Sequence, residues 1–206
     1  MINIQKNQSL LEEFPDLQEA NQKKFPVRIF KNKRDYAGKE KLFYSFSELI
    51  TYLDAPFKLT MPKVAKFLKT KDNANAIIFG ITNEYGRRKN KGEIVTRNAL
   101  AIDIDKVFLN GNLKNHEQIV NKLTENFEYN FYVHTTSSST LKKPCYRLIV
   151  PLSSSISASE YPRAIKKFVK TYIDTSLFKV DPSCEQASRI MFVPFIPSSE
   201  YREYSM

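Results

Sequence analysis

An apolar segment that ends in two aspartates places the strongest constraint on this chain. Residues 98–105 read Asn-Ala-Leu-Ala-Ile-Asp-Ile-Asp. In an extended strand, alternate side chains point to opposite faces, so the leucine and isoleucines are predicted to enter a core while Asp103 and Asp105 share the other face. Two carboxylates one pleat apart repel each other without a counter-charge. Because carboxylate oxygens suit Mg2+ or Mn2+, the pair is a candidate metal site; the alternative is a strand end whose aspartates face water or cap a turn.

The overall charge favours a polyanionic partner. The 206 residues include 32 Lys and Arg against 22 Asp and Glu, a net charge of +10. Hydrophobic residues make up 42% and aromatic residues 13%, which argues for a folded core and against global disorder. A basic protein that also clusters acids is typical of binding to both phosphate and metal, so we expect nucleic acid as the partner.

The cysteines and the N-terminus indicate a cytoplasmic protein. Cys145 and Cys184 are too few for a zinc site and lack the Cys-x-x-Cys spacing, so we expect two reduced thiols. The N-terminus has no apolar segment of the signal-peptide type, and no apolar run is long enough to span a bilayer. We therefore expect no membrane association.

The first half of the chain predicts a small αβ unit with basic loops. Apolar residues at helical spacing predict a helix over 45–54, with Ser45 or Ser47 as its cap. Two loops concentrate cations and are candidates for contact with nucleic acid, through Arg34 in the first and Arg87 and Arg88 in the second. The other predicted elements are a weak helical pattern around 10–17, strands at 25–30 and 76–81, and a short helix at 62–69.

The second half predicts an α+β fold of the ferredoxin-like or RRM-like kind. Its patterns alternate strand, helix, strand, strand, helix and strand, the order of an antiparallel sheet with helices on one face and the other face open to Asp103 and Asp105. We expect residues 1–96 to pack beside this module of residues 97–206 as parts of one domain. The predicted elements are strands near 98–105, 130–135, 146–152 and 189–193, a turn at 110–112, and helices at 114–127 and 157–172.

A second polar block lies between the two middle strands of this module. Hydroxyls, free backbone amides and cations gather there, the donors that a triphosphate requires. The alternative is a polar hairpin loop with a surface histidine and a surface arginine. The candidate ligands are His134, Thr136, Ser138 and Arg147 for the nucleotide, with Lys142 and Lys143 for nucleic acid.

A third block contains Asp181, followed by Ser188 and Arg189 at the start of the last predicted strand. Alone, Asp-Pro is a common turn and Ser-Arg carries no signal. Asp181 is far from Asp105 along the chain, so only the fold can bring the two carboxylates together.

In order and spacing, these blocks resemble the archaeo-eukaryotic primase superfamily, specifically the primase-polymerase domains of plasmids, phages and integrative elements. The resemblance covers residues 97–195. It implies that Asp103, Asp105 and Asp181 hold two catalytic Mg2+ or Mn2+ ions. Many members carry Ser-x-His in the second motif, whereas here no histidine follows Ser137–Ser139. Whether His134 or Arg147 grips the triphosphate is therefore open; the remaining nucleotide ligands implied are Thr136, Ser138, Ser188 and Arg189.

The function expected from the residues and the resemblance is template-dependent nucleotidyl transfer, a DNA primase or polymerase activity that makes replication primers for a mobile element. Two cations would stabilise the attacking and leaving oxygens, and Arg147 and Arg189 would neutralise the β- and γ-phosphates. The expected partners are a single-stranded DNA template and nucleoside triphosphates, with a replicative helicase or initiator protein as a further candidate. The basic residues expected to follow the template are Arg34, Arg87, Arg88, Lys142 and Lys143.

Three alternatives remain open at the level of sequence. A rolling-circle initiator needs paired histidines and a tyrosine nucleophile, and the only two histidines, His116 and His134, are well separated. A metal-dependent nuclease could use the same three acids. A non-catalytic nucleic-acid-binding module would explain the charge but would leave the acids without a purpose.

Overall fold

The computed structural model describes residues 24–54, 57–59, 74–83, 94–108, 115–136, 138–140 and 143–197, with the backbone alone at 57–59 and 195–197. Several predictions lie outside these residues. They are the helical patterns at 10–17 and 62–69, the turn at 110–112, and the basic residues Arg87, Arg88 and Lys142.

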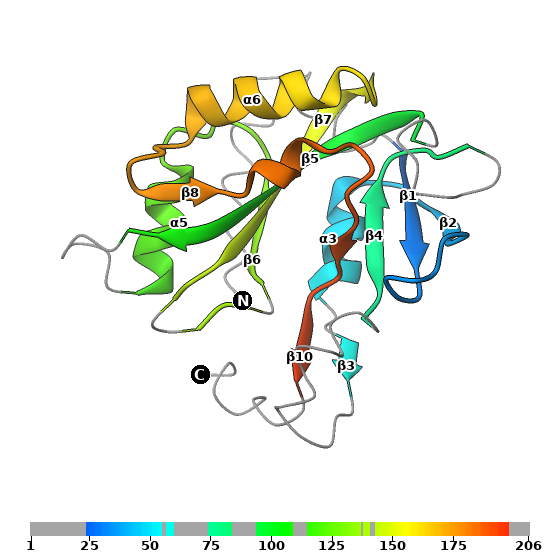
Figure 1. Cartoon of the computed structure of the whole chain (residues 1–206), viewed down its shortest axis with the longest axis horizontal. Helices are drawn as coiled ribbons and strands as arrows, with labels where there is room; N and C mark the ends of the chain where they lie inside the picture. Colours follow the sequence, from blue (N-terminus) through cyan, green and yellow to red (C-terminus); the bar gives the residue numbers. More distant parts are fainter. Residues whose placement is uncertain are drawn as a thin grey trace.

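The second half of the chain forms the predicted antiparallel sheet with two helices, and the α+β class is confirmed (Figure 1). Its strand order is β6-β7-β5-β8, the order of an RRM-like sheet. Leu100, Ile102 and Ile104 point into one core together with both helices, as period-two alternation predicts. The elements are β5 (Thr96–Val107), α5 (His116–Thr124), β6 (Tyr132–Thr135), β7 (Tyr146–Ser157), α6 (Tyr161–Tyr172) and β8 (Phe178–Val180).

Three strands of the first half and one strand near the end of the chain form a second sheet with the order β2-β1-β4-β9. The helix α3 (Phe46–Asp54) packs against it and is capped by Ser45, whose Oγ accepts a hydrogen bond from the Glu48 amide at 3.0 Å. A separate pair of parallel strands joins residues 57–59 to residues 195–197 at the end of the described chain. The strands are β1 (Phe25–Phe30), β2 (Lys39–Phe43), β3 (Phe57–Leu59), β4 (Ala76–Phe79), β9 (Met191–Phe192) and β10 (Phe195–Pro197).

The last predicted strand was assigned to the wrong sheet. We expected residues 189–193 to close the RRM-like sheet, but Met191–Phe192 forms β9 and pairs with β4 of the first sheet. The fourth strand of the RRM-like sheet is instead Phe178–Val180, which pairs with β5. Three residues are too short for a period-two pattern to stand out, and an apolar pair such as Met-Phe does not specify which sheet it joins. The chain therefore crosses between the sheets after Asp181.

The face of the RRM-like sheet opposite its helices is covered over part of its length, contrary to the predicted open face. Ala99 and Ala101 of β5 pack in one core with Phe25 and Phe43 of the first sheet and Leu49 of α3. Small side chains on β5 allow this close approach. The two sheets therefore meet beside the acidic end of β5, and Asp103 is only 5% exposed.

Several element boundaries also differ from the prediction. Strand β7 continues to Ser157, so α6 begins at Tyr161 rather than at 157, with a proline in its first turn. The assignment of residues 1–96 and 97–206 as two units remains a prediction. In the described part of the chain, no helix combines the length and the apolar character that crossing a bilayer requires.

Candidate active site

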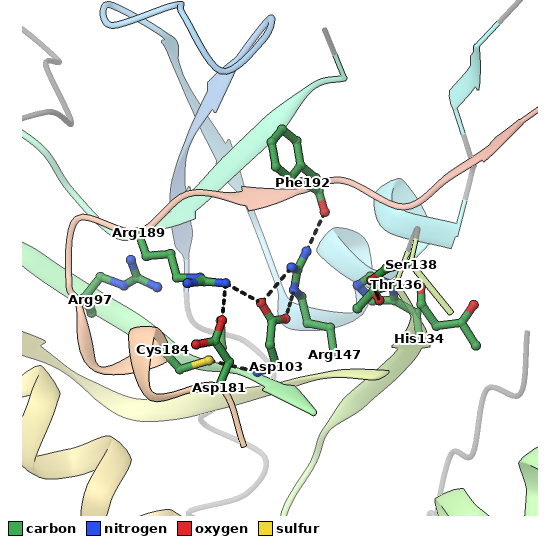
Figure 2. Close-up of polar contacts among 12 residues, drawn as sticks. Arg97, Asp103, His134, Thr136, Ser138, Arg147, Asp181, Cys184, Arg189 and Phe192 are labelled. Atoms are coloured by element: carbon green, nitrogen blue, oxygen red, sulfur yellow. Dashed lines mark hydrogen bonds and ion pairs between the residues drawn. The ribbon is translucent and has the colours of Figure 1, made fainter. Parts of the chain in front are cut away.

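A row of three side chains crosses three neighbouring strands at the centre of the site. Asp103 on β5 pairs in register with Arg147 on β7, which pairs in register with His134 on β6. Arg147 donates from Nε to Asp103 Oδ1 at 2.6 Å and from Nη2 to Asp103 Oδ2 at 3.1 Å. Its Nη1 donates to the Phe192 carbonyl at 2.8 Å, which connects this row to β9 of the other sheet (Figure 2). Arg147 is thus a buried counter-charge to Asp103.

A second arginine joins the acids of the first and third sequence blocks. Arg189 donates from Nη2 to Asp181 Oδ2 at 2.6 Å and to Asp103 Oδ2 at 3.2 Å (Figure 2). The backbone also brings these acids together, because the Asp181 amide donates to the Asp103 carbonyl at 2.9 Å. Asp181 Oδ1 accepts from the Ser183 amide at 2.8 Å and so caps the short 3-10 helix Pro182–Glu185. The fold therefore unites blocks that are widely separated in sequence.

The three carboxyl groups have different electrostatic surroundings. Burial alone would raise the pKa of Asp103, but the charges and hydrogen bonds of Arg147 and Arg189 outweigh it and lower that pKa. Burial likewise opposes ionisation of Asp181, whose pKa is lowered by the hydrogen bonds of Ser183 and by Arg189. Asp105 is exposed, and its pKa is raised by partial burial and by the negative charges of Asp181 and Asp103. An added cation would therefore relieve repulsion most at Asp105.

The three carboxylates are chemically suited to binding a divalent cation, but they are not arranged as a complete metal site. Asp103, Asp105 and Asp181 offer the hard oxygens that Mg2+ and Mn2+ prefer, and the repulsion at Asp105 favours a positive charge. Among the described residues, however, no three His, Cys, Asp or Glu side chains are grouped closely enough to hold a metal ion. Both oxygens of Asp103 already accept from guanidinium groups.

His134 lies in the site as a neutral group. It is 6% exposed, and its pKa is lowered to about 3, first by burial and then by the charge of Arg147. Its Nδ1 lies 2.8 Å from the Thr135 carbonyl, which can only accept, so Nδ1 carries the proton and Nε2 is a hydrogen-bond acceptor. Within the described structure, buried Nε2 has no hydrogen-bond partner. A neutral acceptor is unsuited to holding phosphate oxygens.

The cation best placed for an incoming phosphate is Arg189. Its side chain is 28% exposed, whereas that of Arg147 is 9% exposed and donates from all three nitrogens to protein acceptors. Lys143 is exposed, and its charge acts on Asp105. The half-buried Arg189 and the exposed Lys143 therefore border the acids, while Arg147 is buried.

The remaining sequence candidates divide between the site and elsewhere. Thr136 and Ser138 share a hydrogen bond of 3.1 Å between their hydroxyls at the end of β6, near His134 in Figure 2. Ser188 is half-buried and immediately precedes Arg189. Arg34 is exposed in the loop between β1 and β2, on the first sheet, and no described contact joins it to the acids. Arg34 thus remains a candidate for nucleic acid only.

Both cysteines contact the backbone of the acidic strand, which the sequence did not indicate. The Asp103 amide donates to Cys184 Sγ at 3.0 Å, and Cys145 Sγ donates to the Asp105 carbonyl at 3.2 Å. Burial and the charge of Asp103 raise the pKa of Cys184 to about 12, so it is a thiol at neutral pH. The sequence predicted two reduced thiols but not their hydrogen bonds to the backbone of β5.

A buried arginine, Arg97, was also missed. It is fully buried at the start of β5, stacks over the Tyr161 ring at 4.4 Å and donates from Nη1 to the Ala187 carbonyl at 2.8 Å. Ala187 belongs to the turn that leads to Arg189, so Arg97 supports that turn from inside. A charged residue at the edge of an apolar strand was the only signal in the sequence.

Comparison with protein families gives a match over residues 17–205 to the VapE N-terminal domain. The chain belongs to the VapE N-terminal domain family. This family is a primase-like domain of phage and plasmid origin. The resemblance to a primase family inferred from the three sequence blocks is therefore confirmed.

Comparison of this VapE N-terminal domain with other proteins adds one distant structural likeness. A solved structure of the AEP domain of the primase-polymerase (PrimPol) from cyanophage S-2L matches with a TM-score of 0.39 and 13% sequence identity, covering 89% of this chain and 78% of that chain. No curated protein is matched.

Proposed function

We propose that this VapE N-terminal domain is a template-dependent nucleotidyltransferase, a DNA primase or polymerase that makes or extends primers for a mobile element. One observation carries the proposal. Asp103, Asp181, Arg147 and Arg189, from three separate sequence blocks, meet at one point where the two sheets join. Carboxylates beside cations at one site are what transfer of a phosphate-linked group requires.

Asp103, Asp105 and Asp181 would hold the divalent cations, with Mg2+ or Mn2+ as the candidates and two ions as the proposed number. When bound, such ions stabilise the charge on the attacking and leaving oxygens. Asp105 is the exposed member of the three acids, and Arg147 holds the buried Asp103 carboxylate in a fixed orientation through its two hydrogen bonds. Arg147 is therefore assigned a positioning role rather than the direct contact with triphosphate that the sequence suggested.

Binding of the nucleotide is assigned to the accessible donors around the acids. Arg189 would neutralise phosphate charge, and a guanidinium can do so with two parallel hydrogen bonds. His134 Nε2 is a buried acceptor, so it is not assigned to a phosphate oxygen. The hydroxyls of Thr136, Ser138 and Ser188 complete the candidate nucleotide ligands.

The template is assigned to basic residues. Lys143 borders the acids, and Arg34, Arg87, Arg88 and Lys142 are the other candidates from the sequence. Single-stranded DNA is the proposed template, and a replicative helicase or initiator protein is a proposed partner.

One alternative gains support from a specific observation. Asp103 is already neutralised by two arginines, as expected of a stable structural ion pair in a non-catalytic nucleic-acid-binding module. Such a module would bind single strands through the same basic residues without incorporating nucleotides.

A single assay distinguishes these functions. The full chain would be incubated with primed and unprimed single-stranded DNA, nucleoside triphosphates and Mg2+ or Mn2+, and the products would be separated by size. We expect extension that Asp105→Asn abolishes and that Lys167→Ala, an exposed change on α6, leaves intact. Shortened DNA would identify a nuclease, and retention of DNA without any reaction would identify the binding module.

A further inference from the structure

Two arginines contact the same carboxylate in different ways. Arg147 uses three nitrogens on fixed acceptors and has a side chain that is 9% exposed. Arg189 contacts both acids through a single nitrogen, Nη2, and its side chain is 28% exposed. The first pair is built into the sheet by strand register. The second is a bridge made by one nitrogen of a half-buried side chain that follows a turn.

The Arg189 bridge lies where the two acids of the proposed metal site come together. Its Nη2 lies 2.6 Å from Asp181 Oδ2 and 3.2 Å from Asp103 Oδ2. A divalent cation held by those same two oxygens would face a guanidinium at hydrogen-bonding range, where like charges repel strongly. One cation at a time can use this pair of oxygens.

We propose that Arg189 and the divalent cation exchange on Asp103 and Asp181, and that the displaced guanidinium becomes the ligand of the triphosphate. This inference rests on the proposed function in taking a metal ion and a nucleoside triphosphate as the ligands. Without them, Arg189 donates from one nitrogen to both carboxylates and supplies a positive charge between them. With them, the same arginine is released toward the added phosphate charge. Metal and nucleotide binding are then coupled through one side chain.

The exchange predicts effects of opposite sign for the two ligands. Removing the guanidinium in Arg189→Ala removes a competitor of the metal, so Mn2+ should bind about tenfold more tightly in the absence of nucleotide. The same change removes a phosphate ligand, so dATP should bind about tenfold more weakly at saturating Mg2+. Arg189→Lys retains the charge but loses the fork of donors, so its Mn2+ affinity should stay close to that of the unchanged protein. An ordinary nucleotide ligand would show the second effect without the first.

The test measures Mn2+ binding to the full chain directly, from the loss of the electron paramagnetic resonance signal of free Mn2+. Lys167→Ala is the matched control, since it also removes one positive charge but lies exposed on α6. Thermal unfolding in the presence of a chelator establishes that each variant is folded. Tighter Mn2+ binding in Arg189→Ala, with no change in Lys167→Ala, is the expected result.

Unchanged or weaker Mn2+ binding in Arg189→Ala would overturn the exchange, as would a failure of both proteins to bind Mn2+ at millimolar concentration. The first outcome leaves the proposed function standing, whereas a failure of the unchanged protein to bind Mn2+ would also contradict its two-metal mechanism. A protein that shows the opposite effects on Mn2+ and dATP but incorporates no nucleotide retains the exchange and loses the polymerase assignment.

Discussion

The burial of His134 predicts a loss of stability at mildly acidic pH. The pKa of its imidazole is lowered to about 3 in the folded chain, from 6.5 for an ordinary histidine, because the ring is buried and faces Arg147. Above pH 6.5 the ring is neutral in both the folded and the unfolded chain. As the pH falls toward 3, the unfolded chain binds a proton that the folded chain excludes, so the free energy of unfolding decreases through this window.

The size of the loss follows from the two pKa values. Proton binding to the unfolded chain should lower the free energy of unfolding by about 1 kcal/mol at pH 6 and about 2 kcal/mol at pH 5, relative to pH 7.5. Because the chain has only two histidines, His116 is the one other side chain of this type in the same range. Partial burial also lowers the pKa of His116, so its contribution has the same sign.

Urea denaturation at pH 7.5 and pH 5.0 measures this loss. In His134→Gln the difference between the two pH values should shrink by about 2 kcal/mol, whatever the stability of the variant at pH 7.5. His116→Gln is the matched control, and the contributions of carboxyl groups cancel when the differences are compared. If His134→Gln lost as much stability between these pH values as the unchanged protein, His134 would not be a buried neutral group.

Further outcomes follow from the charges around β5 and from the basic character of the chain. Asp103→Ala should lower the free energy of unfolding by about 3–5 kcal/mol because it leaves the buried Arg147 unpaired. Asp105→Ala should keep or raise the free energy of unfolding because it relieves repulsion between carboxylates. Chemical denaturation without metal measures both changes. The double change Asp103→Leu with Arg147→Leu should recover most of that stability, and a double change as unstable as Asp103→Ala would contradict the assignment of a buried ion pair. Binding to single-stranded DNA, measured by fluorescence anisotropy, should weaken with salt, and the slope of log K against log salt concentration should be about −0.7 per phosphate neutralised. Lys143→Ala should reduce that slope by the value for about one phosphate. An affinity that does not change with salt would argue against contact between these cations and the template.

The local pattern of the sequence was sufficient for much of the second half of the chain. Alternation along β5 fixes which side chains enter the helix-side core, because a pleated strand has only two faces. Apolar residues at helical spacing likewise placed α3, α5 and α6, with errors at their ends. The order of these elements then restricts the sheet to an antiparallel RRM-like arrangement. Candidate site residues were found by residue type and by the family resemblance, both of which are local in sequence.

Only the tertiary structure decided how those residues act on one another. Register places Arg147 directly opposite Asp103. The chain crossing between the sheets brings Arg189 to the same carboxylate and the Phe192 carbonyl to Arg147. Strand pairing over such separations depends on how a whole sheet packs, which no short window of residues encodes. Burial is likewise a property of the assembled molecule, and it makes His134 a neutral acceptor and Arg147 a counter-charge. The sequence by itself therefore determined which groups are available, and the packing of two sheets decided which of them carry charge and remain accessible.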